Sequence, residues 1–88
     1  MKTIKELASM GERVYVHLKD EKTAMSFLRQ AESERFIFGD GVSPTDRHWS
    51  DLYAIHLDGT LNYVGSVGRI EYASEADSCV RVEYQELL

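Results

Sequence analysis

The chain has 88 residues, with 15 acidic and 10 basic side chains and a formal net charge of −5. A domain of this size buries only about 60–65% of the surface that its unfolded chain exposes, so residues 1–88 are expected to form one domain. Hydrophobic residues make up 43% of the chain and charged residues 28%, which is typical of a folded protein. The acidic excess argues against direct binding to DNA or RNA, because that attraction depends on Lys and Arg neutralising phosphates.

The first half of the chain predicts alternating helices and strands. The apolar spacing and the capping residues indicate where each one begins. In chain order, the predicted elements are a short helix after a capping box of Thr3 and Glu6, a half-buried strand over 12–18, an amphipathic helix over 21–33 capped by Asp20, and a brief apolar strand over 36–38.

A β-hairpin is the clearest structural signal in the second half. Asp58 and Gly59 separate two alternating runs, 52–57 and 60–64, which is typical of a two-residue type I′ turn. Such a turn pairs residues whose numbers add to 117. The side chains expected on the core face are Tyr53, Ile55, Leu57 and Val64, and those expected on the opposite face are His56, Leu61 and Tyr63.

Two further strands are predicted, over 67–72 and 79–84. The expected fold is therefore an α+β domain in which two helices pack on one face of a mainly antiparallel sheet of four or five strands. Cys79 is expected to be a small strand side chain rather than a reactive thiol. With one cysteine, no apolar stretch near the roughly 20 residues of a membrane span and no signal-peptide pattern, a cytoplasmic protein without membrane partners is expected.

The thirteen residues 39–51 form a long loop for so small a domain, and long ordered loops are frequently functional. Ser43 and Pro44 also resemble a helix start within it. Arginine suits phosphate, tryptophan stacks on rings, and glycine allows close backbone approach. The candidate ligand-binding residues are Asp40, Gly41, Thr45, Arg47, His48 and Trp49. The alternative is a purely structural loop.

Metal binding and catalysis have less support in the sequence. Five potential ligands lie close together along the chain, but none has the ordered spacing of a known metal motif: Asp46, His48, Asp51, His56 and Asp58. No nucleophile motif is present either. We therefore expect no cofactor, no metal and no enzymatic activity.

Charge is concentrated at the C-terminal end of the chain. Residues 1–35 have a net charge of +1, residues 36–69 of −2 and residues 70–88 of −4. This acidic zone is either a solvated sheet edge or a surface that docks on a basic partner. The residues that would make that contact are Glu71, Glu75, Asp77 and Glu83.

Several short motifs resemble those of small uncharacterised proteins carried by phages and mobile elements of Gram-positive bacteria. The residues concerned lie between about Val14 and Tyr84 and include 38–41, 44–45, 47–51 and 63–65. The resemblance implies a bacterial host cytoplasm and a counter-defence role, either as an inhibitor similar to anti-CRISPR proteins or as a sponge for nucleotide signals. It assigns no functional residue.

Two functions follow as hypotheses. The first is a non-enzymatic binding protein, expected to form a homo-oligomer, that sequesters a phosphate-bearing nucleotide through the 39–51 loop. In it Arg47 would clamp phosphate and Trp49 would stack on a base, with Tyr15 or Tyr63 closing the pocket. The alternative is an acidic inhibitor that docks on the nucleic-acid-binding surface of a host defence protein.

Overall fold

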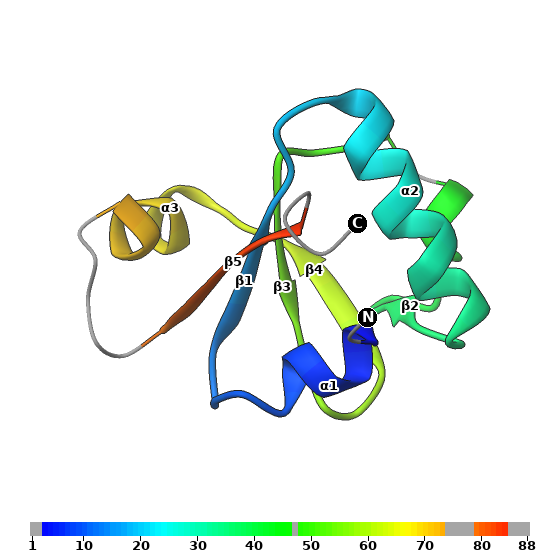
Figure 1. Cartoon of the computed structure of the whole chain (residues 1–88), viewed down its shortest axis with the longest axis horizontal. Helices are drawn as coiled ribbons and strands as arrows, with labels where there is room; N and C mark the ends of the chain where they lie inside the picture. Colours follow the sequence, from blue (N-terminus) through cyan, green and yellow to red (C-terminus); the bar gives the residue numbers. More distant parts are fainter. Residues whose placement is uncertain (1–2, 47, 74–78, 85–88) are drawn as a thin grey trace.

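A five-stranded sheet with helices on both faces forms the centre of the domain (Figure 1). The computed structural model describes residues 3–46, 48–73 and 79–84. In chain order, the elements are α1 (Ile4–Ala8), β1 (Val14–His17), α2 (Glu21–Ser33), β2 (Ile37–Phe38), the 3₁₀ helix η1 (Pro44–Asp46), β3 (Leu52–Ile55), β4 (Thr60–Tyr63), α3 (Ser66–Ala73) and β5 (Val80–Glu83). The predicted α+β class is confirmed.

The predicted starts of the first two helices are confirmed. The Thr3 hydroxyl accepts the Glu6 backbone N–H at 3.0 Å, which caps α1. The Asp20 carboxylate accepts the Thr23 backbone N–H at 2.8 Å, which caps α2. Each cap satisfies a backbone donor that has no partner inside its own helix, so the helix boundary is set by local chemistry.

The main core lies between α1, α2 and one face of the sheet. Phe27 of α2 is fully buried at its centre. Its ring stacks on Tyr53 of β3, with the ring centroids 5.5 Å apart, and meets the edge of Tyr84 at 5.3 Å. These aromatic contacts hold α2 against the middle of the sheet.

The strand order is β2-β4-β3-β1-β5, and the sheet is mixed. β3 is antiparallel to both β1 and β4, but β5 runs parallel to β1 and β2 parallel to β4. The prediction of a mainly antiparallel sheet is therefore wrong in half of its strand pairs. The reason is that α2 and α3 each join two strands that run in the same direction, as crossover helices do.

The predicted strand over 67–72 is also wrong, because these residues belong to α3. This helix packs on the face of the sheet opposite α1 and α2, so three helices cover two faces rather than two helices covering one (Figure 1). Tyr72 of α3 packs on a small second cluster of Tyr15, Leu52 and Val64. Tyr15 meets Tyr72 edge-on, with their ring centroids 6.4 Å apart.

The hairpin between β3 and β4 forms, with a different turn from the one predicted. The His56 backbone N–H donates to the Thr60 carbonyl at 3.0 Å, which leaves residues 57–59 as a three-residue loop. Gly59 is left-handed, with a φ of 89°, whereas Asp58 is not. A type I′ turn needs positive φ at both central residues, but a three-residue loop needs it only at its last position.

The extra loop residue shifts the strand register by one, which moves side chains to the other face. Leu61, predicted to face outward, is fully buried in the main core, and Leu57, predicted to be buried, is 59% exposed. Tyr63 pairs with Tyr53 on the core face, and Val64 packs in the second cluster instead. The burial of Tyr53 and Ile55 is confirmed.

Within the described residues, no helix combines the length and the apolar character that crossing a membrane requires.

Candidate functional site

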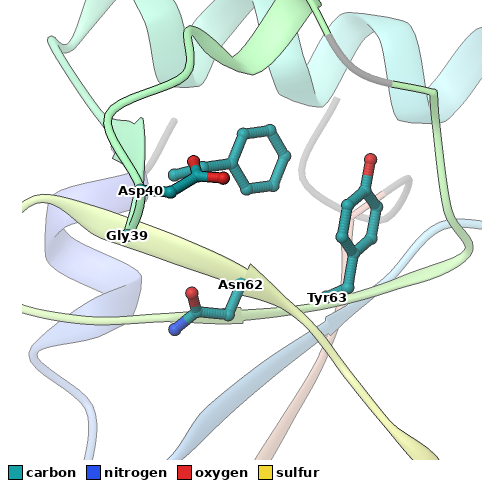
Figure 2. A pocket seen from close by; sticks show the side chains of 5 residues that line it. Gly39, Asp40, Asn62 and Tyr63 are labelled. Atoms are coloured by element: carbon teal, nitrogen blue, oxygen red, sulfur yellow. The ribbon is translucent and has the colours of Figure 1, made fainter.

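A pocket of about 180 Å³ opens at the sheet edge where β2 ends (Figure 2). β2 pairs with β4 over only two residues. The chain then turns away from the sheet, so that, within the described residues, the last residues of β4 have no neighbouring strand on that side. The pocket lies in the notch this creates. Its lining residues are Phe38, Gly39 and Asp40 on one side and Asn62 and Tyr63 on the other.

A tight turn after β2 positions Asp40 at the rim of the pocket. The Gly41 N–H donates to the Phe38 carbonyl at 2.8 Å, and the Phe38 N–H donates to the Val42 carbonyl at 2.9 Å. Gly41 has a positive φ of 90°. A residue with a side chain would be strained in this conformation, whereas glycine adopts it readily. The Asp40 carboxylate accepts the Val42 N–H at 3.3 Å. Asp40 therefore has a defined place in the turn.

Two stacked aromatic rings form the apolar wall of the pocket. The rings of Tyr63 and Phe38 are 5.2 Å apart between centroids and inclined by 25°. Tyr63 also packs on Tyr53, and its hydroxyl donates to the backbone carbonyl of His48. Although Tyr63 is 40% exposed, these contacts hold its ring at both ends. A fixed and partly exposed aromatic ring is a suitable stacking surface for a planar ligand.

Asn62 brings a polar amide to the pocket. Its side-chain nitrogen lies 3.0 Å from Nε2 of His56, which directly follows β3, so the amide is held by a hydrogen bond. Figure 2 shows Asn62 below the pocket, with Asp40 and Tyr63 on opposite sides of it. The site thus combines one carboxylate, one amide and an aromatic wall.

The predicted loop residues divide between the pocket and the scaffold. Asp40 lines the pocket, and Gly41 lies in the same turn but is not a lining residue. Thr45 instead faces α2, where its hydroxyl donates to the Glu32 carboxylate at 2.8 Å. The predicted helix start at Pro44 is confirmed as the single 3₁₀ turn η1, in which Pro44 is buried.

Of the other three predicted ligand-binding residues, the two that the structure describes do not line the pocket. His48 contributes its backbone carbonyl to Tyr63, so it positions a pocket wall. Trp49 is 38% exposed and does not line the pocket. Arg47 lies outside the described residues, and its predicted phosphate contact stays a prediction.

Arg69, the other basic residue of segment 36–69 besides Arg47, makes a structural contact. Its guanidinium donates to the Asp51 carboxylate at 2.8 Å and lies 3.4 Å from the Ser50 hydroxyl. The hydrogen bond from Arg69, aided by its positive charge, lowers the pKa of Asp51. This pair joins α3 to the start of β3.

The described part of the acidic C-terminal zone lies apart from the pocket. Glu83 ends β5, at the sheet edge opposite β2, and its carboxylate lies 2.6 Å from Nδ1 of His17. The ring of His17 in turn stacks on Tyr72 of α3, with centroids 6.1 Å apart. The Glu71 side chain and the whole of Glu75 and Asp77 lie outside the described residues. The partner-binding role of these four residues stays a prediction.

Among the side chains that the structure describes, no three His, Cys, Asp or Glu residues gather as metal ligands. Cys79 is half-buried, and it packs against the second cluster next to β5.

No family model, no curated protein and no solved structure matches the chain. The function is therefore argued from the chain's own side chains.

Phe38 and Asn62 are the pocket residues that the sequence did not single out. Phe38 belongs to a short apolar run that is typical of core, and Asn62 is one polar residue of an alternating strand. Both line the pocket because a parallel pair joins β2 to β4, which no local pattern predicts. Tyr15, considered as a lid, is buried on the opposite face of the sheet.

Proposed function

We propose that the protein is a non-enzymatic binding protein that holds a nucleotide-type ligand by its base in the pocket between Asp40 and Tyr63. The observation that carries this proposal is the stacked pair of Phe38 and Tyr63, which forms a rigid aromatic wall at an open pocket. Planar rings are the ligands that such a wall binds best.

The size of the pocket supports a single ring system as the bound group. Sites for drug-sized molecules have volumes of about 300–1,000 Å³. The pocket of about 180 Å³ is smaller, so the sugar and phosphate of a bound nucleotide would lie outside it. Gly39 and Asp40, the first residues of the 39–51 loop, line the pocket, and the sequence of the same loop contains Arg47, which we expect to meet phosphate.

The fixed position of the Tyr63 ring supports tight stacking of a base on it. Its hydroxyl is bonded to the His48 carbonyl and its face is packed on Phe38 before any ligand arrives. Less side-chain freedom is then lost when a base stacks, and preorganisation of this kind raises affinity. Stacking on an aromatic residue contributes about 1–3 kcal/mol per base.

The role that fits such a protein is sequestration. We propose that it removes a nucleotide from solution, and the resemblance to small phage and mobile-element proteins suggests counter-defence as the setting. In the alternative hypothesis, Glu83 would contact a basic partner. Because its carboxylate is already paired with His17, we favour the pocket as the binding surface.

Titration calorimetry with mononucleotides and cyclic dinucleotides tests the proposal. Tyr63→Ala should weaken binding about 5- to 150-fold, which is the equivalent of the stacking energy, and Tyr63→Phe should retain most of it. Ile70→Ala, at a position 69% exposed on α3, is the control and should bind as the wild type does. Thermal melts show whether each variant folds. No binding by the wild type, or full binding by folded Tyr63→Ala, would overturn the proposal.

A further inference from the structure

We infer that His56 is a positioning residue for the pocket, because it determines which end of the Asn62 amide faces a bound base. This role rests on the proposed function and adds the hydrogen-bonding class of the ligand. While the His56 ring is neutral, the pocket favours a base that carries an exocyclic amino group. Protonation of the ring reverses this preference in favour of a base that carries a carbonyl group.

The orientation of the Asn62 side chain carries the inference. Its nitrogen Nδ2 lies 3.0 Å from Nε2 of His56. Its oxygen Oδ1 points the other way, toward Gly39 at the pocket (Figure 2). A Cβ atom on Gly39 would lie 3.1 Å from this oxygen, so the glycine leaves room for it there. Within the described parts of the chain, no protein group donates a hydrogen bond to Oδ1.

The protonation state of His56 fixes this orientation. An amide nitrogen only donates hydrogen bonds, so Nε2 of His56 has to be the acceptor, and the proton of the neutral ring is on Nδ1. A protonated imidazole ring donates from both nitrogens. Two donors would then meet at His56, and the Asn62 amide has to turn over to place Oδ1 against the ring. The same turn brings the amide N–H groups to the pocket.

The charged groups beside His56 do not titrate over the same pH range. Hydrogen bonds from the N–H and the hydroxyl of Thr60, at 3.0 and 2.6 Å, lower the pKa of Asp58, and charge on His56 adds to this effect. Arg13 lies opposite His56 in the sheet, one residue beyond the last pair of β1 and β3, and arginine keeps its charge. Histidine is the side chain whose charge ordinarily changes between about pH 5 and 8.

The end of Asn62 that faces the pocket distinguishes bases by the polarity of their exocyclic group. This group extends beyond the ring, so it meets a side chain at the edge of a small pocket first. Adenine and cytosine carry an amino group, which donates to Oδ1. Hypoxanthine and uracil carry a carbonyl group at the same place, which needs the amide N–H groups instead. Because Asn62 is exposed, one such hydrogen bond should discriminate by only about 2- to 12-fold.

Calorimetry with AMP and IMP at about pH 8 and about pH 5.5 measures the preference. The two nucleotides share their ribose and phosphate, so titration of the phosphate cancels in the ratio of their affinities. AMP should bind tighter than IMP at the higher pH, by about 2- to 12-fold, and IMP should bind tighter than AMP at the lower pH.

Two variants isolate the positioning role of His56. His56→Gln keeps a donor and an acceptor beside Asn62 but does not titrate, so the ratio of AMP to IMP affinity should no longer change with pH. Asn62→Asp presents an acceptor in either orientation and should favour AMP at both pH values. His17→Gln is the control, because His17 contacts Glu83 and Tyr72 away from the pocket, and the reversal should remain in it. Thermal melts show whether each variant folds.

The ring nitrogens of His56 give a second measurement that needs no ligand. Their NMR chemical shifts distinguish the two neutral tautomers, and at about pH 8 the proton should be on Nδ1. A proton on Nε2 of the neutral ring would overturn the inference whether or not nucleotides bind.

The binding outcomes separate the inference from the proposed function. Tyr63-dependent binding with the same ratio of AMP to IMP affinity at both pH values overturns the role of His56 and leaves nucleotide binding intact. Absence of binding by both nucleotides overturns both.

Discussion

Replacing Gly68 by alanine should destabilise the protein, although the same change stabilises most helices. In an ordinary helix interior, alanine is favoured over glycine by about 0.8–1.0 kcal/mol. A Cβ at position 68 would lie 2.6 Å from Cγ1 of Val64 and 3.5 Å from the Tyr15 hydroxyl oxygen. Carbon atoms in contact prefer about 3.5–4.0 Å, so the added methyl group overlaps Val64 by about 1 Å.

The size of the effect follows from these two opposing contributions. Overpacking by a methyl group costs about 1–3 kcal/mol, and Val64 cannot move aside easily because its side chain is branched and buried. Subtracting the gain in helix propensity leaves a net loss of up to about 2 kcal/mol. For a domain of this size, each kcal/mol shifts the melting temperature by about 4–8 °C.

Thermal and urea unfolding of Gly68→Ala, Val64→Ala and the double variant would measure this coupling. With Val64 shortened to alanine the overlap disappears, so Gly68→Ala should then stabilise by about 0.8–1.0 kcal/mol. Ile70→Ala, exposed on the same helix, should change stability by no more than about 0.5 kcal/mol. A higher melting temperature for Gly68→Ala in the otherwise wild-type chain would refute the packing of α3 on Val64.

Two further predictions test the register of the hairpin and the pairing of α3 with the sheet. Leu61→Ala should destabilise the fold by about 2–5 kcal/mol and Leu57→Ala by almost nothing, whereas the opposite order in urea unfolding would restore the register expected from the sequence. Arg69 lowers the pKa of Asp51, so the pair stabilises the fold above the unfolded pKa of about 3.9 and that contribution is lost as the pH falls through the lower folded value. Because the pair is half exposed, it is worth about 0.2–1 kcal/mol, and Asp51→Asn should lower the melting temperature at pH 7 but not at pH 2. Equal losses at both pH values would show that the ion pair contributes nothing.

The candidate site was only partly accessible to sequence reasoning. The length and glycines of the loop after β2 point to this region, and its first two residues, Gly39 and Asp40, line the pocket, whereas Gly41 lies only in the adjoining turn. Thr45 has the same polar character, but it contacts α2 instead. Residue type alone does not distinguish a side chain that faces a pocket from one that ties a loop to a helix.

The features that the sequence by itself determined are those that depend on residues close together along the chain. The α+β class, the caps at Thr3 and Asp20 and the helix over Glu21–Ser33 depend on residues within one or two turns of each other, and all are as predicted. The hairpin was located for the same reason. Its register was not, because two-residue and three-residue loops share an Asp-Gly signal and differ only in how the flanking strands pack.

The tertiary structure alone decided the parallel pairs, the helical state of Ser66–Ala73 and the pocket itself. Gly68 weakens a helix in isolation, yet it lets α3 approach Val64 closely, so packing overrides local preference there. The pocket joins Asp40 to Tyr63 across a parallel pair of strands that are distant in sequence. Contacts of that kind are selected by the burial of both sheet faces together, which no short stretch of sequence encodes.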